Sequence, residues 1–442
     1  MTRAAVVGLG KLGAPLAAVL ASKGYEVVGV DVHEETVRLL NDGQAPVEEP
    51  GLQELIATHG QHLRATTDLA AAADADLSVV LVPTPSDESG AFSNVHVLAA
   101  VDAIGRGLAG REDYHVVVIG STVMPGSCET EIVPALESAS SRRVGETLGL
   151  CYSPEFIALG SVIRDMTAPD MVLIGESDSR AGEALERVYR EVCENDPPFR
   201  RMNLVNAELT KIAVNTYVTM KISYANFLAD VCERLPGADV EAVTDALGLD
   251  SRIGRKYLRG AIAYGGPCFP RDNKAFAALA HELGAEPLLA EATDSINRGQ
   301  IDRLARIVQS HLRDGDAVGV LGLAYKPDTQ VVEESAGLAL ARVLGDAGYD
   351  VHLYDPVATG AALRILGDNR AHGCESADEL FESSDVVVIA TPWPQFADIP
   401  AILERMDRRP IVIDCWRLLA EEAEAGVEVV RLGRGTRSPA RT

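Results

Sequence analysis

The sequence has few basic residues for the number of its acidic ones. It carries 40 Lys and Arg residues against 65 Asp and Glu residues, which gives a formal net charge of −25. Nucleic acids and anionic membranes are bound through basic surfaces, so neither is an expected partner. A few local Arg and Lys residues suffice for a small anionic ligand, so such a substrate is not excluded.

Cysteine pairs and long apolar runs are also missing. The seven cysteines are scattered without a C-x-x-C pair, which indicates a reduced protein rather than a disulfide framework or a zinc site. No apolar run reaches the length of about 18 residues that a membrane span needs. The chain starts in a predicted strand instead of a basic region followed by an apolar signal core, so we expect a cytoplasmic protein.

Two stretches of the chain alternate short strands with helical patterns. The first series of strands is predicted at 4–7, 27–30, 77–82, 116–119 and 171–174, and the second at 317–321, 350–354, 386–389 and 411–413. Short β-rich runs separated by amphipathic helices indicate a parallel, doubly wound sheet. We therefore expect two α/β domains, with a frayed tail at 434–442.

The segment between the two series is predicted to be helical. Residues 206–235 form one long helix closed by Pro236-Gly237, with small and apolar residues along its whole length. Such a helix needs partners on two sides, so we expect it to form the seam of a homodimer. The predicted domains are 1–199, 200–300 and 301–442: a dinucleotide-binding domain, a helical dimerisation domain and a second α/β domain.

A glycine-rich turn near the N-terminus predicts a dinucleotide site. Gly8, Gly10 and Gly13 follow a predicted strand and open a helix, which is the context that G-x-G-x-x-G requires. Asp31 ends the next strand, where a carboxylate accepts hydrogen bonds from a ribose 2′-OH and repels a 2′-phosphate. We therefore expect NAD rather than NADP, held by the turn, which includes Lys11 and Leu12, and by Asp31.

Three further segments lie where ligands bind in such sheets or repeat the order of this motif. Pro83-Thr84-Pro85 and Ser121-Thr122-Val123 each follow the carboxyl end of a predicted strand, where ligands sit in such sheets, although either alone is compatible with an ordinary turn. The second α/β domain repeats the order of strand, glycine, helix, strand and aspartate, ending at Asp355.

One cysteine lies in an unusual segment, Ala263-Tyr-Gly-Gly-Pro-Cys-Phe-Pro-Arg-Asp272. Glycines at 265 and 266 allow the backbone to approach a ligand closely. A cationic neighbour such as Arg271 favours the thiolate form of Cys268, which is the nucleophilic form. The alternative is a structural cysteine in a Gly-Pro turn, because most thiols are simply small core residues.

Taken together, these motifs resemble those of the UDP-glucose/GDP-mannose dehydrogenase family over nearly the whole chain. The segments that carry the resemblance are the glycine turn with Asp31, Glu49-Pro50-Gly51-Leu52, Pro83-Thr84-Pro85, Ser121-Thr122-Val123, Ser153-Pro154-Glu155-Phe156, Lys211-x-x-x-Asn215, Gly265–Asp272 and Gly322-Leu-Ala-Tyr-Lys-Pro327. The implied fold is two Rossmann-like, doubly wound parallel-sheet domains joined by a long-helix dimerisation region, with the C-terminal domain binding the UDP-sugar.

The resemblance implies an NAD-dependent oxidation of the C6 alcohol of a nucleotide sugar to a carboxylate, with UDP-glucose as the expected substrate. The second oxidation needs a tetrahedral carbon, which a Cys268 thiohemiacetal supplies before it becomes a thioester. Lys211 and Asn215, four residues apart on one helix face, would stabilise oxyanions. The implied catalytic set is completed by water-binding Thr122 and Asp272 and by Glu155 as the base in hydrolysis.

The same resemblance implies the binding residues, and no metal ion. For the cofactor it adds Pro83, Thr84, Thr122 and Arg271. For the nucleotide sugar it implies Glu155, Phe156, Lys211, Asn215, Arg252, Tyr257, Tyr264, Gly265 and Lys326. In this family the arginine at the position of Arg252 reaches the site of a neighbouring subunit, which ties activity to a homodimer.

The chain departs from the family pattern near the substrate. Glu333 stands where the family usually has a substrate-binding arginine, Leu159 replaces a glutamate, Pro267 precedes the cysteine where many glucose-type members have serine, and Ile301 aligns with an arginine of some members. The catalytic set is intact, but UDP-N-acetylhexosamine or GDP-mannose stays open as substrate. A catalytically silent nucleotide-sugar-binding protein is a third reading, and a simple hydroxyacid dehydrogenase ranks last.

Overall fold

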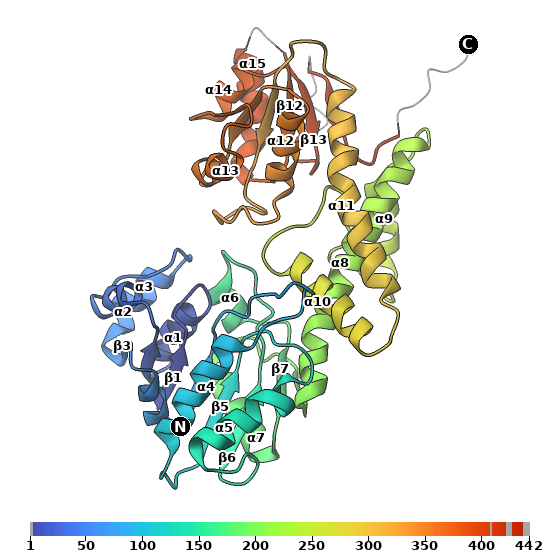
Figure 1. Ribbon diagram of the computed structural model, residues 1–442. Coiled ribbons are helices and arrows are strands. Elements are labelled where there is room, and N and C mark those ends of the chain that lie inside the picture. The colour runs from blue at the N-terminus through green and yellow to red at the C-terminus, as the bar shows by residue number, and fades with distance from the viewer. Residues whose placement is uncertain (1–2, 407–408, 421–426, 436–442) are drawn as a thin grey trace. The chain divides into compact units, whose positions relative to one another are not determined.

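The computed structural model describes residues 3–406, 409–420 and 427–435 (Figure 1). It divides into two compact units, residues 1–213 and 214–442, each built around one sheet. The long helix α8 (Leu204–Arg234) begins in the first unit and continues into the second. The expectation of two α/β domains with doubly wound sheets is confirmed, and the long helix lies within two residues of its predicted bounds.

The sheet of the first unit has eight strands in the order β3-β2-β1-β4-β5-β6-β7-β8. Its strands are β1 (Arg3–Val7), β2 (Glu26–Val30), β3 (Leu63–Thr66), β4 (Leu77–Val80), β5 (His115–Ile119), β6 (Leu148–Tyr152), β7 (Val172–Glu176) and β8 (Phe199–Asn203). The central strand β5 is buried at every position, as expected of a parallel strand covered on both faces. The chain reverses direction across the sheet between β1 and β4, which is where such sheets bind ligands.

The prediction of a wholly parallel sheet is wrong at one pair of strands, β6 and β7. Strand β7 runs antiparallel to β6, and β8 then pairs with β7 in parallel. An antiparallel neighbour needs no long crossover, and the link from β6 to β7 contains only the short helix α6 (Val162–Thr167). Strands β3, β6 and β8 were not predicted, because a central glycine interrupts β6 and two arginines interrupt β8.

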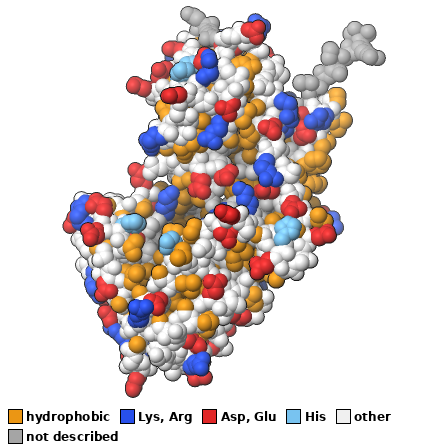
Figure 2. All heavy atoms as spheres, in the orientation of Figure 1, with side chains coloured by type: hydrophobic (Ala, Val, Ile, Leu, Met, Phe, Trp, Pro, Cys, Tyr) orange, Lys and Arg blue, Asp and Glu red, His pale blue; other side chains and the backbone are white. Residues whose placement is uncertain are grey.

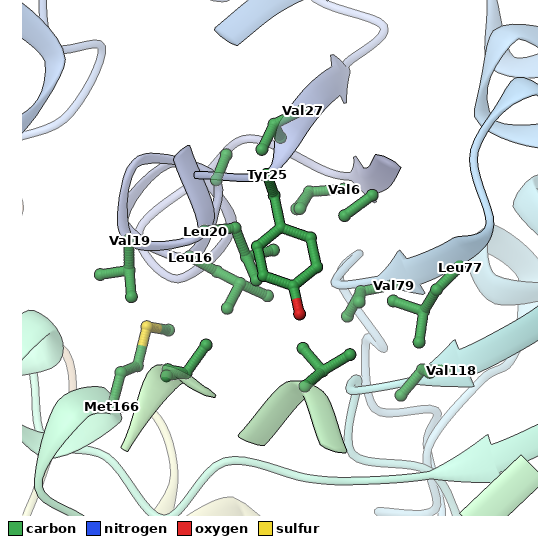
Figure 3. Packing of buried hydrophobic residues seen from close by; sticks show 14 of the residues in the cluster. Val6, Leu16, Val19, Leu20, Tyr25, Val27, Leu77, Val79, Val118 and Met166 are labelled. Carbon is green, nitrogen blue, oxygen red and sulfur yellow. The ribbon is translucent and has the colours of Figure 1, made fainter. Parts of the chain in front are cut away.

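Helices cover both faces of this first sheet. Besides α6 they are α1 (Gly13–Ser22), α2 (Glu34–Asn41), α3 (Leu52–His59), α4 (Val95–Leu108), α5 (Val133–Ser140) and α7 (Ser179–Val192), with short helical turns η1 (Gly60–His62), η2 (Leu69–Asp74) and η3 (Cys128–Ile132). Two apolar clusters lie on the two faces. In one of them the ring of Tyr25 lies beside Leu16 and Leu20 of α1 (Figure 3).

The sheet of the second unit is parallel throughout, in the order β11-β10-β9-β12-β13-β14. Its strands are β9 (Val318–Leu321), β10 (Val351–Tyr354), β11 (Ala371–Gly373), β12 (Val386–Ile389), β13 (Ile411–Asp414) and β14 (Val429–Arg431). Helices of this unit, besides the second part of α8, are α9 (Val240–Leu249), α10 (Phe269–Glu282), α11 (Leu288–Gln309), α12 (Ala336–Asp346), α13 (Thr359–Leu366), α14 (Ala377–Glu382), the turn η4 (Pro394–Asp398) and α15 (Ile399–Arg405). Strands β11 and β14, three residues each, were not predicted.

Both sheets contain a turn in which an aspartate at a strand end accepts an amide of the preceding glycine turn, as the sequence order indicates. The two aspartates differ in how far they are buried. Asp31 accepts a hydrogen bond from the amide of Leu9 at 2.7 Å, and Asp355 accepts one from the amide of Leu323 at 2.7 Å. Asp355 is 3% exposed and also accepts the indole N–H of Trp393 at 3.1 Å. Its hydrogen-bonding capacity is thus used inside the protein, whereas Asp31 keeps part of its surface in solvent.

The last described residues pair with the segment just before α9. Residues 434 and 435 are paired rather than frayed, since Arg434 forms an isolated β-bridge with Asp239 and the amide of Gly435 donates to the main-chain oxygen of Ala238. The rest of the predicted frayed tail, 436–442, lies outside the described residues.

Acidic and basic side chains are interspersed over the face seen in Figure 2. Within the described parts of the chain, no helix combines the length and the apolar character needed to cross a bilayer.

Candidate active site

The glycine turn between β1 and α1 has a shape that fits a dinucleotide pyrophosphate. Gly8 has φ +93°, and a Cβ there would collide with the carbonyl oxygen of Leu81, while a Cβ at Gly13 would collide with the carbonyl oxygen of Gly8. Gly10 is exposed, and a Cβ there would meet nothing within 4 Å. Gly8 and Gly13 are therefore needed for packing, and the space over Gly10 is open at the start of α1, where the helix dipole favours an anion.

Asp31 is positioned to extend this turn. Its two carboxylate oxygens accept the amides of Leu9 at 2.7 Å and His33 at 2.9 Å, which fixes the side chain at the end of β2. A carboxylate retains acceptor capacity beyond two bonds, so Asp31 can also accept from a ribose hydroxyl. Lys11 is exposed and Leu12 partly exposed on the same turn. The residues present thus fit the adenosine half of NAD.

Two loops beyond β4 and β5 are bonded to each other. The hydroxyl of Thr84 donates to the carbonyl oxygen of Thr122 at 2.8 Å. The hydroxyl of Ser121 accepts from the amide of Val82 at 2.9 Å and donates to its carbonyl oxygen at 2.7 Å. Pro83 is exposed beside them and Thr122 is partly exposed. The structure therefore brings both predicted loops together at the carboxyl ends of neighbouring strands.

Glu155 and Lys211 meet in the first unit. The Lys211 ammonium, on a residue that is 8% exposed, donates to the main-chain oxygen of Glu155 at 2.6 Å and lies 4.7 Å from the centre of the Phe156 ring. Burial raises the pKa of the Glu155 carboxyl to about 7, although the Lys211 charge and a hydrogen bond from Tyr189 act in the opposite direction. A carboxyl with such a pKa can gain and lose a proton near neutral pH.

Glu49 holds the loop that follows Glu155, a contact that sequence reasoning missed. Its carboxylate accepts the amides of Gly160 at 3.0 Å and Val162 at 2.7 Å, the latter being the first residue of α6. Anionic side chains are stabilised at helix N-termini by unpaired amides and the helix dipole. The only sequence signal was the quoted motif that starts at Glu49, to which no role was assigned.

In the second unit, Cys268 is exposed and occupies the residue just before α10. Its main-chain oxygen accepts the amide of Asp272 at 2.8 Å. The carboxylate of Asp272, on a residue 1% exposed, accepts Asn215 Nδ2 at 2.6 Å and the guanidinium of Arg271 at 3.3 Å. The thiol thus lies at the N-terminus of a helix, where the helix dipole favours an anion. The alternative of a buried core cysteine is wrong, because Cys268 is exposed.

Two asparagines that the sequence did not single out fix the segment leading to Cys268. Asn226 of α8 accepts the amide of Ala261 at 2.8 Å and donates to the oxygen of Ile262 at 2.9 Å. Asn297 of α11 accepts the amide of Tyr264 at 2.9 Å and donates to its oxygen at 3.0 Å. Each side-chain amide thus holds one donor and one acceptor of a stretch that belongs to no helix or strand.

The next residues are packed against the loop after β9. A Cβ at Gly265 would collide with the main-chain oxygen of Glu334, and one at Gly266, which has φ +83°, would lie 2.6 Å from the Tyr325 ring. The amide of Gly266 donates to the main-chain oxygen of Glu333 at 3.1 Å. Both glycines are therefore required by close approach to protein backbone and ring, a cause that the sequence reading had attributed to a ligand.

The remaining predicted substrate residues lie in different surroundings within the second unit. Tyr257 is 53% exposed and Tyr264 is 8% exposed, and both rings meet the Phe269 ring edge-on, with centroids at 6.3 Å and 6.2 Å. Arg252 has a side chain that is 86% exposed and pairs with Asp250 at 2.6 Å. The ammonium of Lys326 lies 5.9 Å from the centre of the Tyr325 ring.

Helix α8 carries a residue of each half of the predicted catalytic set. Lys211 bonds to Glu155, and Asn215, one helical turn later, bonds to Asp272. Residues four apart on a helix share a face, as the sequence predicted. Among the residues that the structure describes, no group of three or more His, Cys, Asp and Glu side chains is arranged to hold a metal ion.

A doubly wound sheet with a G-x-G-x-x-G turn and an aspartate at the next strand end defines the class of an NAD-dependent dehydrogenase. Sequence models of three domains of one family match the chain: the NAD binding domain over residues 2–193, the central domain over 205–299 and the UDP binding domain over 319–421. The chain belongs to the UDP-glucose/GDP-mannose dehydrogenase family, and it is an NAD-dependent oxidoreductase.

Relatives span almost the whole chain. UDP-glucose 6-dehydrogenase AglM of Haloferax volcanii is 38% identical over 94% of this chain and 96% of its own length. The GDP-mannose 6-dehydrogenase of Pseudomonas aeruginosa is 33% identical over 90% of this chain and 93% of its own. The solved UDP-glucose dehydrogenase of Pyrobaculum islandicum superposes with a TM-score of 0.87 at 34% identity, covering 98% of this chain and 97% of that one.

Proposed function

We propose that this chain oxidises the C6 hydroxymethyl group of UDP-glucose to the carboxylate of UDP-glucuronate, through a thioester on Cys268. The observation that carries the proposal is the exposed Cys268 at the N-cap of α10, whose main-chain oxygen accepts the amide of Asp272, the residue whose carboxylate is paired with Asn215. The full catalytic set is Cys268, Lys211, Asn215, Asp272, Thr122 and Glu155.

Cys268 makes the second of the two oxidations possible. NAD, when bound, accepts a hydride from the C6 carbon in each oxidation. The Cys268 thiolate adds to the carbon of the aldehyde that the first oxidation leaves, forming a C–S bond, and the carbonyl oxygen takes a proton. The resulting thiohemiacetal carbon is tetrahedral and carries a hydrogen that can leave as hydride, and its loss together with the hydroxyl proton gives the thioester.

Water then releases the acid. Glu155 takes a proton from water held by Thr122 and Asp272, the C–S bond breaks after addition of the hydroxide to the thioester, and Cys268 leaves as thiolate. Lys211 and Asn215 stabilise the negative charge that develops on the C6 oxygen, since an ammonium and a side-chain amide are both donors. Covalent capture also keeps the aldehyde from diffusing away between the two oxidations.

The nucleotide sugar is proposed to bind through side chains from all three of the proposed domains. Arg252 offers a planar fork for the diphosphate, and Lys326 lies past the end of β9 in the C-terminal domain. Phe156, Tyr257, Tyr264 and Gly265 complete the set. These roles follow the proposed domain division into a cofactor-binding part (1–199), a helical part (200–300) and a part that binds the UDP-sugar (301–442).

The identity of the sugar is supported by relatives whose names include UDP-glucose, one by sequence and one by structure. A second candidate, GDP-mannose, is supported by the relative from Pseudomonas aeruginosa. Glu333, which is exposed and stands where an arginine would contact the substrate, keeps the choice of substrate open. A carboxylate near a diphosphate repels it, so the phosphates must be held by other groups.

We also propose that the chain acts as a homodimer. Four apolar residues on α8 at helical spacing are exposed: Tyr217 at 57%, Tyr224 at 50%, Phe227 at 48% and Val231 at 41%. A stripe of this kind on a soluble surface marks a protein interface. The exposed Arg252 would then reach the substrate of the partner subunit.

Product analysis of the purified protein with NAD tests the proposed function. Against UDP-glucose, UDP-N-acetylglucosamine, GDP-mannose and dTDP-glucose, we expect the highest kcat/KM with UDP-glucose, and two NADH formed for each sugar acid released. One NADH per sugar with an aldehyde product would contradict the double oxidation. A preference for GDP-mannose would keep the chemistry and replace the substrate, and no turnover of any of the four would contradict the enzyme mechanism.

The pKa of Glu155 predicts how the rate depends on pH. Hydrolysis needs the ionised carboxylate, and burial raises its pKa to about 7, so the ionised fraction falls as the pH drops below that value. We expect kcat to decrease about tenfold per pH unit on the acid side, and thioester to accumulate on Cys268 there. Measuring kcat against pH for the wild type and for Glu155→Gln checks this, since the variant should have a low rate with no such acid limb.

A further inference from the structure

The hydroxyl groups of Tyr189 and Ser153 connect the Glu155 carboxyl to the interior of the sheet through successive hydrogen bonds. The hydroxyl of Tyr189, on α7, is 3.4 Å from Glu155 Oε1 and 2.9 Å from the hydroxyl of Ser153, which follows β6. The Ser153 hydroxyl is in turn 3.0 Å from the main-chain oxygen of Leu173 on β7. The chain of contacts therefore runs from the carboxyl of Glu155 to a carbonyl in the interior of the sheet.

The number of protons shared among these three hydrogen-bond contacts depends on the protonation state of Glu155. Each hydroxyl can donate one hydrogen bond, and the carbonyl oxygen of Leu173 can only accept. When Glu155 is protonated, it donates to Tyr189, Tyr189 to Ser153, and Ser153 to Leu173, so all three contacts hold a proton. When Glu155 is ionised, Tyr189 turns its proton toward the carboxylate, and one of the remaining two contacts has none.

Both arrangements use the same positions of the heavy atoms. Only hydroxyl protons rotate between them, and hydroxyl groups rotate readily to suit their partners. Ser153 is 3% exposed, so water cannot replace its partners without disturbing the sheet. A carboxyl that first takes a proton from water and later returns it is thereby supported in each state.

We propose that Tyr189 and Ser153 are positioning residues that form a two-hydroxyl relay, which supports Glu155 both in the ionised state that takes a proton from water and in the protonated state that follows. The inference rests on the proposed role of Glu155 in thioester hydrolysis. It deepens that role, because it assigns the proton balance of Glu155 to two residues outside the proposed catalytic and binding sets.

Titratable groups on neighbouring elements act on Glu155. In the part of the chain that the structure describes, they are Lys211 on α8 and, from α7 and its C-cap, Tyr189 and Cys193. Burial raises the pKa of Tyr189 well above its usual value and that of Cys193 to about 11. Lys211 lowers the pKa of Glu155 through its charge. Tyr189 and Cys193 therefore do not contribute to an acid limb near pH 7.

Removing each hydroxyl has an effect of opposite sign. Tyr189→Phe removes the donor to the carboxylate, and a hydrogen bond to a charged acceptor is stronger than one between neutral groups, so the pKa of Glu155 rises. Ser153→Ala leaves the Tyr189 proton without an acceptor whenever Glu155 is protonated, which disfavours the protonated state, so this pKa falls. A general loosening of the fold would move both variants in the same direction.

The experiment compares pH profiles of kcat, and of the fraction of protein that carries a substrate adduct on Cys268, in three variants of the full-length chain. We expect the acid limb of Tyr189→Phe to shift upward by about half to one pH unit, and that of Ser153→Ala to shift downward. Tyr25→Phe is the matched control, because the Tyr25 hydroxyl bonds to Glu191 on the same helix α7, and it should keep the wild-type profile.

An unchanged limb in both relay variants, or shifts of the same sign, overturns the relay while leaving the proposed function intact. If thermal unfolding shows that Tyr189→Phe is not folded, the Ser153→Ala variant decides. A downward shift of its acid limb supports the relay, and an unchanged acid limb overturns it. A wild-type profile whose acid limb persists in Glu155→Gln contradicts the proposed role of Glu155, and the relay with it.

Discussion

Replacing Cys268 with serine should abolish the formation of the sugar acid. A serine hydroxyl is far less ionised than a thiol at neutral pH and adds poorly to an aldehyde, so the second oxidation lacks its tetrahedral intermediate. We expect kcat for acid formation to fall by about 10³-fold or more, the scale seen when a covalent nucleophile is removed. Quantifying the nucleotide-sugar acid and the NADH by chromatography measures this loss.

A second cysteine provides the control for this substitution. Cys374 is 7% exposed and follows β11 in the C-terminal sheet, far in sequence from the proposed site. Cys374→Ala removes a thiol without touching the proposed catalytic set, so its acid formation should match the wild type. Acid formation by Cys268→Ser at a rate near that of the wild type would show that the sulfur is not the nucleophile.

Replacing Lys211 with methionine should cost the second largest share of the rate. The ammonium is held by the main-chain oxygen of Glu155 and lies over the Phe156 ring, so it is fixed before the substrate arrives. Loss of one fixed donor to a developing oxyanion lowers kcat by about 10²- to 10³-fold, or about 3–4 kcal/mol. Methionine keeps the length and most of the packing of the side chain, so we expect KM to change much less than kcat.

Steady-state kinetics with UDP-glucose checks this prediction against Lys23→Met. Lys23, at the end of α1, pairs with Glu194 at 2.7 Å and has a side chain that is 23% exposed, so the control removes another partly buried lysine of the first unit. A Lys211→Met variant that loses affinity while keeping its kcat would indicate a binding role in place of oxyanion stabilisation.

The parts of the fold that were predictable from the sequence are those with strong local signals. The runs of β-branched residues in β5 and β12 and the uninterrupted helix α8, followed by Pro236-Gly237, carry their structure in neighbouring residues. Strand β8 contains Arg200 and Arg201, which are placed by pairing with β7 rather than by their own pattern. The antiparallel direction of β7 likewise depends on pairing that local sequence does not encode.

The residues of the candidate site likewise differ in whether the local sequence identifies them. The glycines at 8 and 13 were informative because a Cβ at either position would collide with main-chain oxygen. Asn226, Asn297 and Tyr189 gave no signal, since these residue types occur in many settings and their partners lie 33 to 36 residues away in the chain. Such contacts become visible only when the fold brings distant segments together.

Peptide mapping by mass spectrometry of enzyme quenched during turnover tests the central claim most directly. The wild type is mixed with UDP-glucose and NAD below the pKa of Glu155, where hydrolysis is slow, and then quenched in acid. We predict an adduct with the mass of the oxidised nucleotide sugar, linked to the peptide that contains Cys268, which forms and decays at the rate of acid release. Acid release at the full rate with no adduct on Cys268 at any time would contradict the account.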